Sequence, residues 1–142
     1  MLRLTRQTYL EMIGHAYDGL PLEACGLLAG APLDEGGHAA AGGRFYPCGN
    51  EAESSRVYTV HPRDHLRADR DAEERGLDLI GVMHPHTHTD AYPSPTDVAQ
   101  APDPGWHYVI VSLRDEAPVL RSFRIVDGAI LEEAVELVER PL

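Results

Sequence analysis

The sequence contains no lysine, and all twelve of its basic residues are arginine. Its 23 acidic residues outnumber them, so the formal net charge is −11 at pH 7. The absence of lysine is most simply explained by a GC-rich coding sequence. The shortage of positive charge argues against a nucleic-acid partner, because binding to phosphates requires a basic face.

Cysteine and long apolar runs are also scarce. Cys25 and Cys48 are too few for a disulfide framework, and neither belongs to a Cys-x-x-Cys pair, which excludes a cysteine-rich zinc site. No apolar run reaches the roughly 18 residues of a membrane span, and the N-terminus lacks the apolar core of a signal peptide. We therefore expect a cytoplasmic protein without membrane contact. A length of 142 residues with 43% hydrophobic content suits a single globular domain over residues 1–142.

Hydrophobic periodicity and turn residues predict helices that alternate with strands. Three helices are expected, over Thr5–Gly19, over Arg63–Arg75 after Pro62, and from Ser94 onward. Strands are expected over Ala24–Ala29, His38–Pro47, Arg56–Val60, Leu77–Met83, Trp106–Leu113, Val119–Val126 and Ala129–Val138, with turns at Gly30–Gly37 and Asp127–Gly128. This order predicts a mixed sheet in a three-layer α/β or α+β domain.

The most informative motif is His84-Pro85-His86, followed after ten intervening residues by Asp97. Alternate residues of a strand share a face, so a strand end can direct both imidazoles the same way. A helix that begins at Ser94 can bring Asp97 back toward them. Two histidines and one carboxylate form a three-ligand zinc site with an open fourth position, which is typical of catalytic zinc. Taken alone, Asp97 could equally serve only as a helix cap.

Two further residues are candidates for catalysis. Glu23 precedes an apolar strand, where a carboxylate requires a partner, and it could act as the general base for a zinc-bound water. Ser94 could donate a hydrogen bond to the oxyanion of a tetrahedral intermediate. The alternatives are a solvated loop carboxylate for Glu23 and a plain N-cap for Ser94.

The remaining histidines and aromatic residues have simpler interpretations. His88 could replace a ligand, but a position on the rim of the site is favoured. His61 and His107 are interpreted as structural or surface residues, and Trp106 and Tyr108 as core residues.

These residues together resemble the JAMM (MPN-plus) metalloprotease family. The family pattern is an upstream Glu, then His-x-His, ten residues and Asp, with Ser three residues before the Asp; here Glu23, His84, His86, Ser94 and Asp97 match it. The segment from Pro21 to Gly30 is similar to the Glu-bearing segment of the family. The resemblance implies one Zn²⁺ per chain on His84, His86 and Asp97, with Glu23 as the base and Ser94 at the oxyanion. It also implies a curved mixed sheet flanked by helices, akin to cytidine deaminases.

The segments 87–98, 107–112 and 121–128 are most similar to the bacterial hydrolases of sulfur-carrier-dependent cysteine biosynthesis. This similarity implies cleavage after the C-terminal Gly-Gly of a small ubiquitin-like sulfur-carrier protein, with release of cysteine. The alternatives are a general isopeptidase that removes ubiquitin-like modifiers and a non-catalytic scaffold. A homodimer is compatible with the sequence but is not indicated by any motif.

Two residues depart from the usual pattern of the family. Pro85 stands where Ser is usual between the histidines, so this segment loses a backbone N–H and becomes stiffer. Thr87 stands where Pro is usual, in agreement with the sulfur-carrier branch.

Overall fold

The computed structural model describes residues 1–31, 40–52, 58–101 and 103–139, and the side chains of residues 40–42 are not described. Three helices and eight strands make up this part of the chain. In chain order they are β1 (Leu2–Thr5), α1 (Arg6–Asp18), β2 (Cys25–Ala31), β3 (Ala40–Cys48), α2 (Pro62–Glu74), β4 (Asp78–His86), α3 (Pro95–Ala99), β5 (His107–Ser112), β6 (Val119–Val126), β7 (Ala129–Glu133) and β8 (Val135–Val138).

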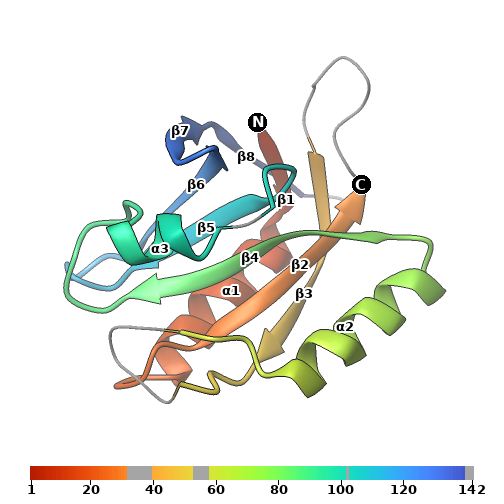
Figure 1. The fold of residues 1–142 in the computed structure, drawn as a ribbon, viewed down its shortest axis with the longest axis horizontal. Helices are drawn as coiled ribbons and strands as arrows, with labels where there is room; N and C mark the ends of the chain where they lie inside the picture. The colour runs from red at the N-terminus through yellow and green to blue at the C-terminus, as the bar shows by residue number, and fades with distance from the viewer. Residues whose placement is uncertain (32–39, 53–57, 102, 140–142) are drawn as a thin grey trace.

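The strands form one mixed sheet in the order β7-β6-β5-β4-β2-β3-β1-β8 (Figure 1). The β4–β5, β1–β3 and β1–β8 pairs are parallel, and the other neighbours are antiparallel. β4 lies near the centre of the sheet and ends in His84 and His86. The mixed sheet, the three helices and the general fold class confirm the expectation from the sequence.

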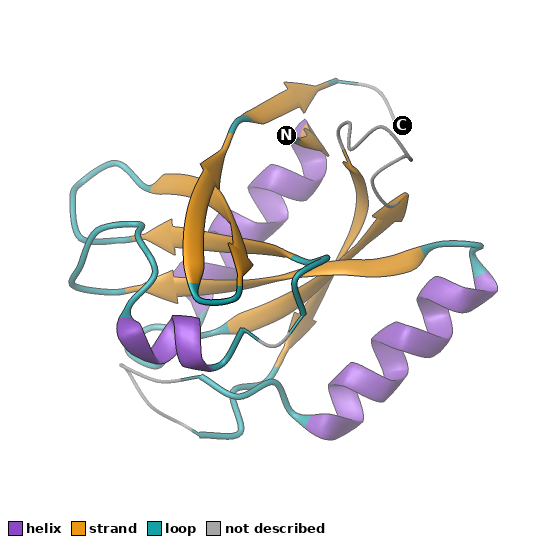
Figure 2. Ribbon diagram, turned by 45° about the horizontal axis from the view of Figure 1, so that its top comes forward, coloured by secondary structure: helices purple, strands orange, loops and turns teal. Residues whose placement is uncertain are grey.

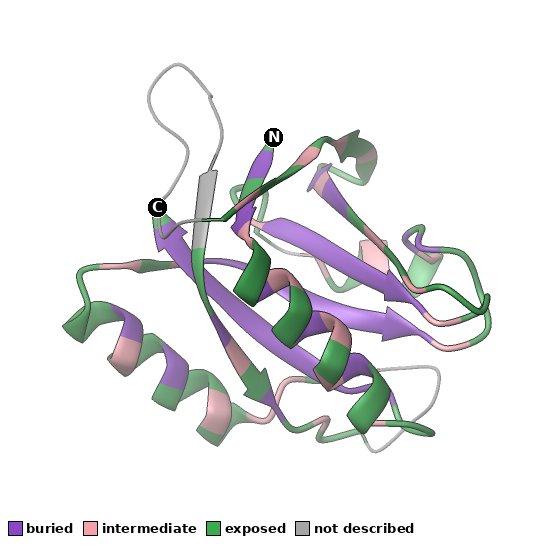
Figure 3. Cartoon of the chain, turned by 180° about the vertical axis from the view of Figure 1, so that it is seen from behind, coloured by how far each residue is buried: buried purple, intermediate pink, exposed green. Residues whose placement is uncertain are grey.

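Helices cover both faces of the sheet. Met12 and Ala16 of α1 pack in one cluster with Leu28, Met83 and Val109. Figure 3 shows α1 crossing this face in front of buried strands. On the other face, Ala68 of α2 packs in a second cluster with the neighbouring strand residues Leu27, Val82 and Tyr108. Consecutive strand residues thus contact opposite helices, as the two-residue period of a strand requires.

The helix ends follow the signals in the sequence. Thr5 caps α1, and its hydroxyl oxygen accepts the backbone N–H of Thr8. His61 caps α2 through its ring, which accepts the N–H of Arg63, and Gly76 follows the helix with φ of +72°. The interpretation of His61 as structural is therefore confirmed. Neither of these 13-residue helices, nor any other in the described part of the chain, is long and apolar enough to cross a membrane.

The C-terminal prediction was wrong in one respect. The expected single strand over Ala129–Val138 is two strands, interrupted at Ala134. β7 pairs with β6 at one edge of the sheet, whereas β8 pairs with β1 at the other edge. The chain passes from one edge to the other because the sheet is strongly curved, and Figure 2 shows this crossing. The carbonyl of Ala134 accepts the N–H of Leu2 at 2.9 Å, which fixes the crossing point.

Other expectations differ in extent or fall outside the described residues. β1, whose Leu2 and Leu4 are fully buried, was not expected from the sequence. Most of the predicted turn over Gly30–Gly37 lies outside the described residues, as do the first two residues of the predicted strand His38–Pro47 and the beginning of Arg56–Val60. The described end of the last segment forms only an isolated bridge between Val60 and Asn50. The Asp127–Gly128 turn has φ of +50° and +78°, as a two-residue hairpin requires.

Candidate metal centre

Three side chains converge where β4 ends and α3 begins. His84 and His86 project from the same face of β4, and their Nε2 atoms are 3.2 Å apart. Asp97 approaches both of them from the first turn of α3, with Oδ1 3.2 Å from Nε2 of His84 and Oδ2 2.9 Å from Nε2 of His86. One potential ligand atom from each residue lies within 4.8 Å of the other two. The sequence spacing thus predicted a real spatial cluster.

Contacts around the cluster orient the rings. The Nδ1 atom of His86 lies 2.7 Å from the carbonyl oxygen of Asp90 and donates to it, which leaves Nε2 directed at the cluster. The carboxylate of Asp90 in turn contacts Arg114 at 2.6 Å. The ring of Tyr58 stacks on His84 with centroids 4.3 Å apart and an interplanar angle of 16°. His88 is exposed and does not belong to the cluster, so nothing in this arrangement supports the alternative that it replaces a ligand.

The electrostatics favour a negative carboxylate between two imidazoles. Although burial opposes its charge, hydrogen bonds from His84 and His86 hold the pKa of Asp97 far below its ordinary value. Burial lowers the pKa of His84. For His86, burial acts in the same direction, but the hydrogen bonds to Asp97 and to the Asp90 carbonyl raise its pKa overall. A divalent cation can take the place of the protons between these nitrogens and the carboxylate.

Glu23 is buried beside the cluster. It lies just before β2, and the antiparallel register of Gly26 with Met83, continued toward Glu23, brings this residue level with His86. The side chain is only 3% exposed, and its Oε2 atom has no hydrogen-bond partner among the described residues. Burial raises the pKa of Glu23 from 4.5 to about 7, an effect that His86 partly offsets and Asp97 reinforces. The alternative that Glu23 is a solvated loop carboxylate is therefore wrong.

Ser94 forms the N-cap of α3 in a reciprocal capping box with Asp97. The Ser94 hydroxyl oxygen accepts the Asp97 N–H at 3.1 Å, and Asp97 Oδ2 accepts the Ser94 N–H at 2.9 Å. The same carboxylate therefore caps the helix and approaches the histidines. Because the hydroxyl oxygen is the acceptor in the cap, its proton is available for a second partner.

The donor set suits a metal ion of the zinc type. Two imidazole nitrogens and one carboxylate oxygen are ligands that Zn²⁺ accepts, and an open fourth position is the catalytic arrangement. The second ring nitrogen of His86 is already fixed by a carbonyl, as is usual for ligating histidines, whereas Nδ1 of His84 has no hydrogen-bond partner among the described residues. The unpartnered oxygen of Glu23 next to the ligands fits a site whose occupant is polar. Pro85, between the two histidines, lies in β4 opposite Val111 of β5 and does not prevent the ligands from converging.

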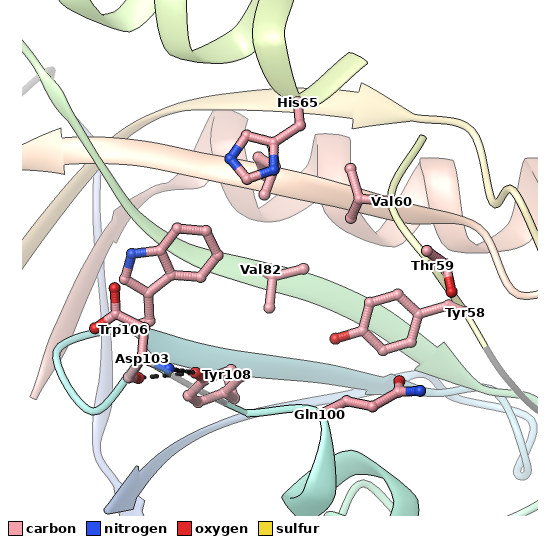
Figure 4. A pocket seen from close by; sticks show the side chains of 10 residues that line it. Tyr58, Thr59, Val60, His65, Val82, Gln100, Asp103, Trp106 and Tyr108 are labelled. Atoms are coloured by element: carbon pink, nitrogen blue, oxygen red, sulfur yellow. Dashed lines mark hydrogen bonds between the residues drawn. The ribbon is translucent and has the colours of Figure 1, made fainter. Parts of the chain in front are cut away.

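A mostly apolar cleft of about 470 Å³ lies next to the cluster (Figure 4). Its floor includes Val82, two residues before His84, and its walls include Tyr58 and Trp106. Trp106 and Tyr108, expected in the core, do pack in the second hydrophobic cluster, where Tyr108 is buried and Trp106 is half-buried, and both also line the cleft. The contact of Tyr58 with His84 was missed. The position of Val82 at two residues from His84 was the one signal in the sequence that could have indicated a shared face.

Comparisons with known proteins agree with this geometry. Residues 5–126 match the family described as prokaryotic homologs of the JAB domain. The chain is 42% identical over 130 residues to the CysO-cysteine peptidase of Mycobacterium tuberculosis, covering 91% of this chain and 86% of that protein. It is 35% identical over 107 residues to the desampylase of Haloferax volcanii, covering 72% of this chain and 73% of that protein.

Solved structures show the same fold. The solution structure of a protein from Desulfitobacterium hafniense matches with a TM-score of 0.89 at 36% identity, covering 99% of this chain and 95% of that one. A second solution structure, of a protein from Salinibacter ruber, matches with a TM-score of 0.75 at 33% identity over the same shares. Because the family model matches residues 5–126 and the chain is 42% identical to the peptidase, the chain belongs to the family of prokaryotic homologs of the JAB domain.

Proposed function

We propose that this protein is a zinc-dependent peptidase that cleaves the bond after the C-terminal Gly-Gly of a ubiquitin-like sulfur-carrier protein and releases cysteine. That the chain is a hydrolase of the peptidase type follows from its family and from its 42% identity to a named peptidase. The substrate is inferred from that relative, which is named for the CysO-cysteine adduct. The observation that carries the proposal is the convergence of His84, His86 and Asp97 beside a buried carboxylate.

His84, His86 and Asp97 would hold the ion, and a bound Zn²⁺ supplies Lewis acidity and lowers the pKa of a coordinated water. The other roles belong to side chains of this protein. With its pKa raised to about 7, Glu23 can accept a proton from water and return it at neutral pH. Hydrolysis breaks the amide C–N bond: the carrier gains a terminal carboxylate, and the leaving amine of cysteine gains the proton that Glu23 held.

Ser94 is proposed to stabilise negative charge on the carbonyl oxygen of the substrate. Its hydroxyl oxygen is fixed by the Asp97 N–H, so its proton can be directed at one point beside the ligands. The capping role of Ser94 is thus compatible with a catalytic one, because the two roles use different atoms of the hydroxyl group.

The direct test is incubation of the purified protein with CysO carrying a C-terminal cysteine, followed by mass spectrometry of the carrier tail. Release of cysteine that is lost in Glu23→Gln, with zinc content unchanged, supports the proposal. Cleavage by Glu23→Gln at the wild-type rate would show that the role of Glu23 is wrong. A protein that takes up no metal from zinc-replete medium would instead support the non-catalytic scaffold.

A general deconjugating isopeptidase is the second candidate, and the 35% identity to a desampylase favours it. The two candidates differ in the leaving group. Parallel reactions with a carrier–cysteine adduct and with the same carrier linked to a lysine side chain separate them. Faster cleavage of the lysine conjugate would reverse our preference.

We also propose that the protein acts in the cytoplasm. Cys25 and Cys48 are direct register partners in β2 and β3, and both are free thiols. Such a pair of unlinked cysteines suits a reducing compartment. Fractionation of cells that express the protein tests this location.

A further inference from the structure

The cleft beside the metal ligands has a floor built from three adjacent strands. Leu27 of β2, Val82 of β4 and Tyr108 of β5 are direct register partners and point to the same face. His84 lies on that face two residues further along β4. The row of apolar side chains and the row that holds the ligands are therefore successive levels of the same sheet surface.

The two rows are separated by a distance that an extended peptide can match. Two residues of a β-strand span about 6.6 Å. A substrate tail bound as an extended chain has almost the same rise per residue. If the carbonyl of its last glycine lies at the ligands and the tail runs alongside β4 toward Val82, the residue two positions earlier lies level with Val82. That residue immediately precedes the diglycine. Because residues two apart in an extended chain face the same side, its side chain points to the same side of the tail as the Cα hydrogens of the last glycine.

We propose that the cleft binds the side chain of the residue preceding the diglycine and that it selects an apolar side chain there. This inference rests on the proposed function and adds a specificity-determining subsite to it. Tyr58 joins the subsite to the metal centre, because its ring lines the cleft (Figure 4) and also stacks on His84.

The chemistry of the walls supports the choice of an apolar side chain. A volume of about 470 Å³ accommodates a branched aliphatic side chain together with its backbone. The hydroxyl of Tyr108 is already used, because it donates to the backbone carbonyl of Asp103 at 2.8 Å. The exposed Asp103 carboxylate at the cleft adds negative charge to a chain whose net charge is already −11. The polar side chains Thr59, His65 and Gln100 also line the cleft, but they come from α2 and from segments outside the strands of the floor. An acidic side chain would meet repulsion there, and a polar amide that reaches the apolar floor would lose water without gaining a partner from it.

The chain carries a built-in reporter of this cleft, since Trp106 is its single tryptophan. We would titrate the wild-type protein with three tail peptides that end in Leu-Gly-Gly, Asn-Gly-Gly or Ala-Gly-Gly and record tryptophan fluorescence. Leu and Asn have nearly the same shape, so they separate polarity from size. We expect the leucine peptide to change the emission at a concentration about tenfold lower than either of the others. Equal midpoints, or no change with any peptide, would overturn the proposal.

A second measurement links the subsite to turnover. CysO–cysteine adducts with Leu, Asn or Ala before the diglycine are compared in wild type and in Trp106→Ala. Trp106→Ala should reduce kcat/KM about tenfold or more for the leucine adduct but less than about threefold for the alanine adduct. Tyr17→Ala is the matched control, because Tyr17 is an aromatic residue 40% exposed on α1, on the opposite face of the sheet.

The outcomes separate the two proposals. Equal cleavage of all three adducts would refute the subsite and leave the proposed function intact. No cleavage of any adduct, together with a fluorescence response that still prefers leucine, would refute the proposed substrate and support the subsite. If Trp106→Ala does not fold, the titration of the wild-type protein decides the matter alone, because it needs no variant.

Discussion

Glu23→Gln should make the metal-free protein more stable while it abolishes turnover. The carboxyl group of Glu23 is buried, with one oxygen unpartnered among the described residues, and its pKa is raised from 4.5 to about 7. Between these two pH values the folded protein keeps a proton that the unfolded chain has already released. Stability therefore falls as the pH rises through this window, and the loss is complete above pH 7.

The size of the effect follows from the same pKa values. A rise from 4.5 to about 7 corresponds to roughly 3 kcal/mol at about 1.4 kcal/mol per pH unit. Relaxation around the charged group and the residual solvent contact reduce this upper value, so we expect a gain of about 1–3 kcal/mol for Glu23→Gln at pH 8. Glutamine carries no charge at any pH, so the gain should shrink toward zero at pH 4.5.

The assay is urea unfolding of chelator-treated protein at several pH values between 5 and 8, followed by circular dichroism. Glu11→Gln is the matched control, because Glu11 is exposed on α1 and its neutralisation should change the free energy of unfolding by less than about 0.5 kcal/mol. A Glu23→Gln variant that is equally or less stable than wild type at pH 8 would refute the argument that the buried charge destabilises the fold.

Three further predictions concern the cap, the ion and the backbone. Ser94→Ala should cost about 1 kcal/mol through loss of the Asp97 cap and lower kcat about 100-fold or more with little change in KM, as thermal melts and steady-state kinetics would show. An unchanged kcat would show that Ser94 acts only as the N-cap of α3. Removal of metal by a chelator should abolish cysteine release, and added Zn²⁺ should restore it; full activity of metal-free protein would contradict the zinc assignment. Gly26→Ala should destabilise the fold by more than about 2 kcal/mol, because a Cβ there would overlap the ring of Phe45. Gly14→Ala, in the open middle of α1, should instead stabilise it by about 0.5–1 kcal/mol, and equal melting temperatures for the two variants would refute the packing argument.

The ligand cluster could be predicted because it depends on local geometry. The shared direction of His84 and His86 follows from the period of a strand, and the start of α3 follows from Ser94 and Asp97 three residues later. The approach of Glu23 is different. It depends on the pairing of β2 with β4, which joins segments about 60 residues apart. The place of Glu23 before an apolar strand indicated that the carboxylate needs a partner, but no local pattern located that partner on β4.

The errors have a common physical cause, which is pairing that no local pattern records. The break at Ala134 is not marked by a turn residue, since neither glycine nor proline occurs in 129–138, and it exists because β8 finds its partner in β1 at the far edge of the sheet. β1 has only four residues, too few for its alternating Leu2 and Leu4 to be distinguished from chance.

The pairing of β1 with β8 has a consequence for biosynthesis. The first strand lies between β3 and β8, and the register couples Leu2 with Val135 and Thr5 with Val138. During translation, the N-terminal strand leaves the ribosome more than a hundred residues before its second neighbour does. Throughout that interval one side of β1 has no native partner, so a nascent chain exposes an unpaired strand edge until β8 has been synthesised. Ribosome-associated chaperones would have most to protect in this protein at the exposed edge of β1.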